Sequence, residues 1–225
     1  MEQKEIERQI KILEKSIKEM FDLIPFELNV AKKYDNQIKK LFVKLISKGY
    51  LKIKTDNLDL IYEENLDTWS RIKYFVEPEN NSTFQQVFYL IKPQKTALIL
   101  GCSLYLMIFE NLLAQFDNKT IIKIFADIKN KKSINIGSYI SIYSKIEILK
   151  RFDKLNSLFL NKLDRKLRNI IGHFNFQIQD EKLTYNGNSI SKEQLREKTE
   201  KILWLNHMVL LNKSLVIREY LLKKI

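Results

Sequence analysis

Apolar side chains recur at spacings of three and four residues along most of this chain, and this is the periodicity of an amphipathic helix. The clearest case lies at the amino terminus, where spacings of four and three alternate up to Pro25. The apolar positions of this stretch are Ile6, Ile10, Leu13, Ile17, Met20 and Ile24. The 225 residues include only five glycines and three prolines, so few positions interrupt a helix. We therefore predict a mostly α-helical protein.

The length allows one large or two small domains, and we place a boundary near Lys92-Pro93. Residues 1–92 are expected to form a smaller helical accessory region, with helices over residues 35–47, 66–76 and 83–91 after the first one. Residues 93–225 are expected to form a helical bundle. Its five helices are predicted over residues 96–116, 119–129, 136–151, 163–175 and 191–224. The last of them begins with a capping box, because Gln194 lies three residues after Ser191.

A short β-hairpin is predicted between the last two helices, over residues 176–190. Apolar and polar residues alternate on both sides of Asp180-Glu181, a pair that can form a turn. Asn186-Gly187 is a turn signal, and we expect it to mark the end of the hairpin.

A lysine-rich segment near the amino terminus admits a second interpretation. Residues 32–54 carry eight lysines and one aspartate. The helix within this segment is followed by two short alternating runs, residues 51–54 and 58–62, which fit a hairpin. A helix followed by such a hairpin is similar to a winged helix-turn-helix, a DNA-binding module. The alternative is that this region only completes the core.

The apolar run over residues 97–109 is about 13 residues long and closes at Glu110, which suits a buried helix better than a membrane span. The amino terminus has no signal-peptide layout. Cys102 is the single cysteine and lies among apolar residues, so we expect it to pack in the core. We therefore expect a cytoplasmic protein. The sequence shows no glycine-rich phosphate loop, no metal-spaced Cys/His set and no nucleophile elbow, so we expect no cofactor and no metal.

The net charge of +12 is unevenly distributed along the chain. Residues 1–92 carry 16 basic and 15 acidic side chains, whereas residues 93–225 carry 23 basic and 12 acidic ones. The second segment therefore has an electrostatic attraction for nucleic acid. The same charge also fits a nucleic-acid-binding protein without catalytic activity, or one with an acidic protein partner.

Residues 163–175, LDRKLRNIIGHFN, place Arg168, Asn169 and His173 within about one and a half turns of a helix. At about 100° per residue, the apolar side chains of this helix form one stripe that would face the core. The stripe consists of Leu163, Leu167, Ile170, Ile171 and Phe174. The three polar side chains project away from it, with Asn169 and His173 stacked and Arg168 about 140° from His173. Because Arg168 and His173 point in different directions, a pocket that contains both would close more easily against a second protomer.

This arrangement resembles the HEPN superfamily, whose members are small helical proteins and often ribonucleases. The matching residues are Arg168, Asn169 and His173, and Leu167 together with the following hairpin is similar to the abortive-infection-like branch. The resemblance covers residues 93–225. It implies that Arg168, Asn169 and His173 form a catalytic set in a homodimer. It also implies that the protein is a toxin or an antiviral-defence effector, with an antitoxin or a defence-system protein as its partner. In one branch a tyrosine two residues after the histidine receives a nucleotide, but this chain has Asn175 there.

The chemistry of the residues agrees with the activity that the resemblance implies. A 2′-hydroxyl beside a phosphodiester needs a proton acceptor, charge stabilisation and a protonated leaving group, and it needs no metal. Histidine, with a pKa of about 6.5, exchanges protons near neutral pH. Arg168 would bind the phosphate through its fork, and Asn169 would orient the histidine or the phosphate.

Three further residues near the motif are candidates for the same site. Glu110 is the only acid within an apolar stretch, and a buried carboxylate needs a partner, so it would cross the bundle to Arg168 or His173. The alternative is an ordinary glutamate on a polar edge. Arg165 and Lys166 are expected to bind RNA. The other histidine, His207, lies among packing residues and is expected to be structural.

We therefore expect a metal-independent endoribonuclease that cleaves RNA by 2′-hydroxyl attack. The main alternative is a catalytically inactive protein that binds RNA or a protein partner. A DNA-binding regulator that uses the lysines of residues 32–54 is the third hypothesis.

Overall fold

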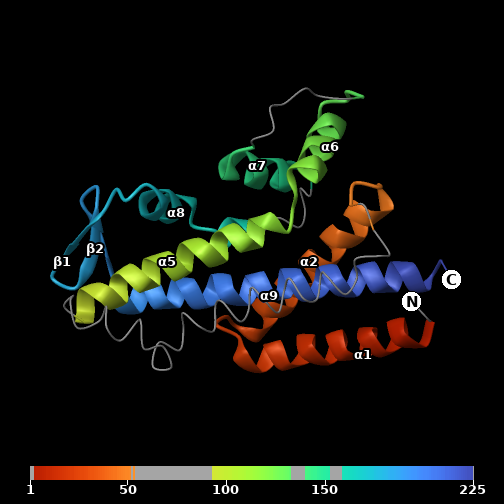
Figure 1. Cartoon of the computed structure of the whole chain (residues 1–225), viewed down its shortest axis with the longest axis horizontal. Coiled ribbons are helices and arrows are strands. Elements are labelled where there is room, and N and C mark those ends of the chain that lie inside the picture. The colour runs from red at the N-terminus through yellow and green to blue at the C-terminus, as the bar shows by residue number, and fades with distance from the viewer. Residues whose placement is uncertain (1–2, 52, 54–92, 133–139, 153–158, 225) are drawn as a thin grey trace. The chain divides into compact units, whose positions relative to one another are not determined.

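The computed structural model describes residues 3–51, 53, 93–132, 140–152 and 159–224. This part of the chain is mostly α-helical and carries one small antiparallel sheet (Figure 1). The predicted fold class is therefore confirmed. The helices predicted over residues 66–76 and 83–91, and most of the hairpin predicted over residues 51–62, lie outside the described residues.

The chain forms two compact units, and each is built from segments that are separate in the sequence. The first unit comprises Met1–Leu58, Asn111–Leu163 and Trp204–Ile225, and the second comprises Asp59–Glu110 and Asp164–Leu203. The division between these units does not fall at Pro93, because the amino-terminal helices belong to the same unit as the carboxyl-terminal half of the last helix.

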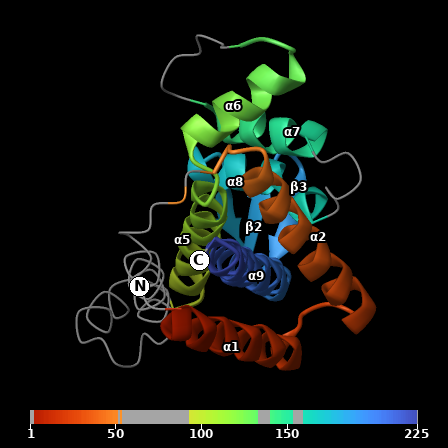
Figure 2. The same cartoon turned by 90° about the vertical axis from the view of Figure 1, so that its right-hand side faces the viewer.

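The first unit contains most of the helices. They are α1 (Gln3–Met20), the 3-10 turn η1 (Phe21–Leu23), α2 (Leu28–Ser47), α6 (Asn118–Ile128), α7 (Ile142–Phe152), the 3-10 turn η4 (Leu160–Lys162) and the end of α9 (Lys192–Leu222). The helices α1 and α2 contact α9 (Figure 2). The Trp204 indole donates a hydrogen bond to the Met20 carbonyl at 2.9 Å, and the Asn212 amide donates to Asp35 at 2.8 Å. These bonds join segments at opposite ends of the chain.

The second unit is built around the beginnings of two long helices, α5 (Pro93–Ala114) and α9, which lie side by side. Gly101 lies at their contact, where an added Cβ atom would lie 3.1 Å from Leu195 Cδ2 and that side chain would have to shift by a few tenths of an ångström. The short helix α8 (Arg165–Gly172) and the strands β1 (Gln177–Gln179), β2 (Lys182–Tyr185) and β3 (Asn188–Ser191) complete the unit (Figure 1).

The sheet has the order β1-β2-β3, and all of its pairs are antiparallel. Ile178, Leu183 and Ile190 lie opposite one another, and Leu183 and Ile190 are buried, so this row forms the inner face. The two-stranded hairpin predicted from the sequence is therefore one strand short. Asn186-Gly187 is not the end of the hairpin but a second tight turn, which leads into β3.

Both turns of the sheet have two central residues with positive φ, as in type I′ turns. The φ angles are 47° and 60° at Asp180 and Glu181, and 45° and 74° at Asn186 and Gly187. Such turns match the right-handed twist of the strands that they connect. Glycine adopts a positive φ without strain, whereas Glu181 carries a side chain in this region.

The predicted capping box at the start of α9 is confirmed by two reciprocal hydrogen bonds. The Gln194 backbone N–H donates to Ser191 Oγ at 3.2 Å, and the Ser191 backbone N–H donates to Gln194 Oε1 at 3.0 Å. The box gives the backbone N–H groups of Ser191 and Gln194 a hydrogen-bond acceptor each. It therefore defines where β3 ends and α9 begins.

Helix α5 is more extensive than the apolar run of residues 97–109 suggests. It continues through Glu110, and its window Ala97–Ala114 has a mean hydropathy of 1.8 over 18 residues. By length and composition this window is able to cross a membrane, and 39% of it is buried within the protein. The core helix of a soluble protein has the same properties, so this finding does not decide between the two settings.

The two turns of the sheet provide a matched test of backbone strain. We expect Glu181→Gly to raise the free energy of unfolding by about 0.5 kcal/mol, because it relieves a left-handed conformation but adds freedom to the unfolded chain. Gly187→Ala should lower it by about 1 kcal/mol through backbone strain alone, since no atom lies within 4 Å of the added Cβ. Urea denaturation of both variants measures these changes, and shifts of the same sign would contradict the turn assignment.

Candidate active site

The motif helix α8 is shorter than the helix predicted over residues 163–175, because it begins at Arg165 and ends at Gly172. Its apolar side chains Leu167, Ile170 and Ile171 are buried, as the periodicity predicted. Asp164 caps its amino terminus by accepting a hydrogen bond from the Leu167 backbone N–H at 3.0 Å.

The carboxyl end of α8 is a Schellman motif. His173 is the C-cap, and Phe174 follows with a left-handed φ of 54°. The Phe174 N–H donates to the Ile171 carbonyl at 3.1 Å, and the Asn175 N–H donates to the Ile170 carbonyl at 2.9 Å. These two bonds satisfy carbonyl groups that the last turn of the helix would otherwise leave without a partner.

The early end of the helix corrects one prediction. Phe174 was assigned to the buried stripe by assuming that the helix continues through residue 175, but its side chain is 83% exposed. The reversal of the backbone at this residue turns the ring away from the core. The left-handed position after a helix is usually occupied by glycine, so the phenylalanine is conformationally unfavourable here.

The guanidinium of Arg168 is held by two side chains of the second unit. Its Nε atom donates a hydrogen bond to Glu110 Oε1 at 2.8 Å, and Nη2 donates to the same oxygen. Nη1 donates to Asn169 Oδ1 at 3.2 Å. The contact between Glu110 of α5 and Arg168 of α8 is the one expected from the sequence. Two of the five guanidinium N–H groups then remain for a further acceptor.

The Arg168 side chain extends along α8 to Gly172. A Cβ atom on Gly172 would lie 3.6 Å from Arg168 Cζ and Nη1, and 3.6 Å from Leu106 Cδ1. The guanidinium therefore lies at the carboxyl end of α8, beside the residue that directly precedes His173. The Arg168 side chain is only 19% exposed, whereas that of Glu110 is 42% exposed.

His173 and Asn169 are both exposed, and their direct contact is a backbone one. The His173 backbone N–H donates to the Asn169 carbonyl at 3.0 Å, while the Asn169 side-chain oxygen accepts from Arg168. Among the described residues, none forms a hydrogen bond with the His173 imidazole. The ring is therefore accessible to an external proton donor or acceptor.

The two expected RNA-binding residues lie in the first turn of α8. Lys166 is exposed and Arg165 is half-buried. The preceding residue, Asp164, also forms an ion pair with Lys198 of α9 at 2.9 Å. Burial raises the pKa of the Asp164 carboxyl, but the hydrogen bonds from Leu167 and Lys198 outweigh it, so the pKa lies below its ordinary value.

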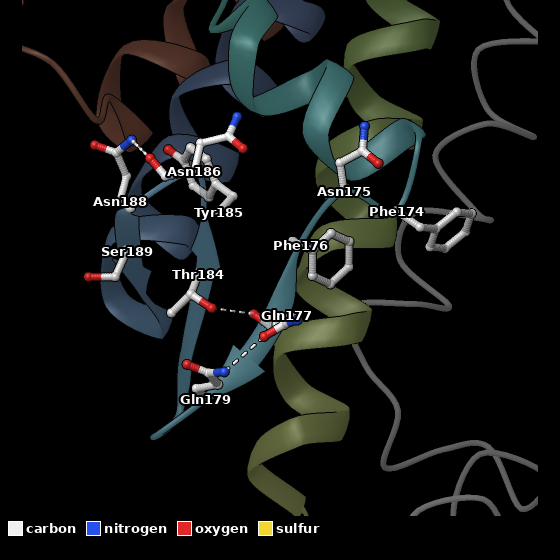
Figure 3. Close-up of a pocket in the computed structure, with 11 residues that line it drawn as sticks. Phe174, Asn175, Phe176, Gln177, Gln179, Thr184, Tyr185, Asn186, Asn188 and Ser189 are labelled. Atoms are coloured by element: carbon white, nitrogen blue, oxygen red, sulfur yellow. Dashed lines mark hydrogen bonds between the residues drawn. The ribbon is translucent and has the colours of Figure 1, made fainter.

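A pocket of about 650 Å³ adjoins the end of α8, and sequence reasoning did not find it (Figure 3). It is lined by Phe174, Asn175, Phe176, Gln177, Gln179, Thr184, Tyr185, Asn186, Gly187, Asn188 and Ser189. Apart from Gly187, these residues carry an aromatic ring, an amide or a hydroxyl, and none of them is charged. Its first lining residue directly follows His173 in the chain. The alternation of polar with apolar residues along the strands was the available signal, but it predicted only the hairpin.

Cys102 and His207 lie among buried residues, as the sequence predicted. Cys102 is buried, and burial raises the pKa of its thiol to about 12, so the thiol is protonated at neutral pH. His207 lies in the first unit within α9, where its neighbours Leu205, Asn206 and Met208 are buried. Within the described part of the chain, no three His, Cys, Asp or Glu side chains are grouped to hold a metal ion.

Comparisons with protein-family models, with curated proteins and with solved structures find no match to this chain. The assignment of a function therefore depends on the geometry and chemistry of the residues described above.

The cap of α8 gives a pH-dependent prediction. Asp164→Ala should lower the free energy of unfolding by about 1 kcal/mol at neutral pH, because it removes an N-cap. The lowered pKa of Asp164 means that its carboxylate stabilises the folded state above its ordinary pKa, and that this contribution is lost as the pH falls through the folded-state pKa. Urea denaturation at pH 7 and at successively lower pH should show the wild type and the variant converging. A difference that is constant with pH would contradict the role of the ionised carboxylate.

The Glu110–Arg168 pair is suited to a double-mutant cycle. Glu110→Ala, Arg168→Ala and the double variant should reveal a coupling free energy of about 1 kcal/mol, since the pair is only part-buried. The coupling should decrease in high salt. A coupling near zero would mean that the contact does not hold Arg168 in place. The exposed pair Arg196 and Glu200 on α9, treated in the same way, is the control.

Proposed function

We propose that this chain is a metal-independent endoribonuclease that cleaves RNA by attack of the 2′-hydroxyl on the adjacent phosphodiester. One observation carries the proposal. The Arg168 guanidinium is oriented by Glu110 and Asn169 and reaches the carboxyl end of α8, where the exposed His173 follows. A positioned cation and an accessible imidazole at the same end of one helix suit phosphodiester chemistry.

The reaction that these groups support has three parts. A histidine acting as base removes the proton from the 2′-hydroxyl, and the oxygen attacks phosphorus while the bond to the 5′-oxygen breaks. A second proton donor protonates that 5′-oxygen. Arg168 stabilises the negative charge on the phosphate oxygens during the transfer. The products are a 2′,3′-cyclic phosphate and a 5′-hydroxyl end.

We further propose that two protomers form the active site together. The described part of the second unit supplies one histidine, whereas the reaction needs one proton acceptor and one proton donor. In a homodimer with two-fold symmetry, each protomer would contribute His173 and Arg168 to a shared site. Glu110 acts as a positioning residue in this scheme, because it contacts the arginine and not the substrate.

The charge distribution supports RNA as the substrate. Residues 93–225 carry 23 basic and 12 acidic side chains, which favours association with a polyanion. Lys166 is exposed on the first turn of the motif helix and is the candidate for a phosphate contact. We propose that the protein acts in the cytoplasm as a toxin or defence effector of the HEPN type, restrained by an antitoxin or another partner.

A second candidate function is RNA binding without cleavage. It is favoured by the same Glu110 contact, because a carboxylate already occupies two of the guanidinium donors and neutralises its charge. In this case the arginine would be a structural residue. Activity of the variants distinguishes the two functions.

The test uses a mixture of fluorescently end-labelled single-stranded RNAs, incubated with the full chain in the presence of EDTA. The wild type should cleave, and His173→Ala should lower the rate at least 100-fold through loss of a general acid or base. Arg168→Ala should lower it by a similar factor through loss of charge stabilisation. Product ends should carry a cyclic phosphate, and an all-DNA strand of the same sequence should remain intact.

The control is His207→Ala, which removes the other histidine from the first unit and should leave the rate unchanged. Equal cleavage by the wild type and His173→Ala would exclude this site. RNA binding without cleavage by any variant would favour the second candidate. Mixing the wild type with increasing amounts of His173→Ala tests the shared site, because a mixed dimer would lack one of the two imidazoles and the rate per wild-type protomer should fall as the variant is added. A rate per wild-type protomer that does not change would contradict the shared site.

A further inference from the structure

We propose that the pocket beside the end of α8 holds an unpaired base of single-stranded RNA, stacked against Phe174. This inference rests on the proposed function for the class of ligand, and it adds a recognition site that is separate from Arg168 and His173. The pocket would bind the nucleotide that flanks the cleaved bond.

The first support comes from the conformation of Phe174. This residue has a left-handed φ of 54°, which costs a side-chain-bearing residue about 1–2 kcal/mol relative to the right-handed region. The residue is also 83% exposed, so burial does not offset the strain. Glycine would satisfy the Schellman motif without either cost. Strain that the fold itself does not explain is concentrated at functional positions.

The second support is the aromatic surface that this residue forms. The rings of Phe174 and Phe176 lie with their centroids 6.5 Å apart and their planes at 29° (Figure 3). Phe174 is exposed and Phe176 is half-buried, so Phe176 supports the ring of Phe174. An exposed ring is a surface on which a base stacks, and this mode accepts unpaired bases because a duplex hides their faces.

The third support is the hydrogen-bonding character of the pocket. Its lining contains amides and hydroxyls but no charged side chain, so it suits a neutral planar group rather than a phosphate. Gln179 Nε2 donates to Gln177 Oε1 at 2.8 Å, which fixes the two amides side by side (Figure 3). The Gln177 amide nitrogen and the Gln179 amide oxygen remain available. An adjacent donor and acceptor match the edge of a nucleobase.

The position of the pocket selects RNA from among other planar ligands. Phe174 and Asn175 follow His173 without an intervening residue, so a base on Phe174 belongs to a nucleotide close to the proposed reacting phosphate. Free nucleotides share the same base chemistry, and the experiment separates them from a strand.

The experiment measures binding of a fluorescein-labelled 12-nucleotide single-stranded RNA by anisotropy, with every protein carrying His173→Ala to prevent cleavage. Phe174→Gly should weaken binding about tenfold, through loss of base stacking. The same substitution should raise the melting temperature by about 1–2 °C, because it relieves strain. Phe174→Trp should retain binding. The matched control is Asn130→Gly, a change without a difference in charge at another left-handed residue (φ 53°) that belongs to the first unit, and it should leave binding unchanged.

The glutamine pair is tested for base preference. Gln177→Ala with Gln179→Ala should reduce the difference in affinity between oligo-uridine and oligo-adenosine, while the average affinity falls less than in Phe174→Gly. The affinity for duplex RNA should not change in Phe174→Gly. Binding of uridine or adenosine monophosphate as tight as that of the 12-mer would identify a free nucleotide as the ligand and overturn the proposal.

The outcomes for this pocket and for the proposed function are distinguishable. Cleavage by the unmodified protein with no effect of Phe174→Gly on binding would overturn the base site and leave the ribonuclease proposal intact. Binding that depends on Phe174, without cleavage by the unmodified protein, would support the base site and contradict the ribonuclease. Absence of any single-stranded RNA binding would overturn the base site.

Discussion

The short helix α8 depends on its tertiary contacts, and the candidate active site depends on α8. Helices shorter than about 12–15 residues are marginal in water, and α8 has only eight residues. Its amino-terminal end is attached to both long helices of the second unit, since Tyr105 of α5 donates to the Asp164 carbonyl and Lys198 of α9 pairs with the Asp164 carboxylate. Its carboxyl-terminal end is attached to α5 through Arg168 and Glu110. Helix formation and site formation are therefore one event.

The same ion pair has two consequences that oppose each other. Glu110 holds the Arg168 guanidinium in a defined orientation, and preorganised charge is what stabilises a transition state. The carboxylate also occupies donors and offsets the positive charge that a phosphate would otherwise meet. Because the Glu110 side chain is 42% exposed, water moderates this offset. The balance between the two effects separates a catalytic arginine from a structural one.

The left-handed residue Phe174 and the pocket both lie at the carboxyl end of α8. A Schellman motif reverses the chain at His173 and Phe174, so that the phenyl ring faces solvent. The reversal also directs the chain into β1, whose amides line the pocket. If the helix continued, Phe174 would be buried, and neither the exposed phenyl ring nor the pocket beside β1 would form. The backbone conformation of Phe174 thus determines which side chains line the pocket.

Several elements could be predicted because their signals are local. The capping box of Ser191 and Gln194, the buried face of Leu167, Ile170 and Ile171, and the turn at Asp180-Glu181 each follow from residues a few positions apart. The end of α8 at Gly172 was missed because a helical wheel assumes continuity and because Phe174 is apolar. The third strand was missed because its buried residue, Ile190, is isolated between polar ones.

What the sequence by itself determined is the helical character of the chain, the periodic faces of its helices and the candidacy of Arg168, Asn169 and His173. These follow from patterns within one segment, where spacing dictates which side chains share a face. Only the tertiary structure decided that Glu110 rather than another group holds Arg168, and that α6, α7 and the end of α9 belong to the same unit as the amino-terminal helices. Contacts between residues distant in sequence depend on how buried surfaces fit together, and a single sequence does not encode that fit in any local pattern.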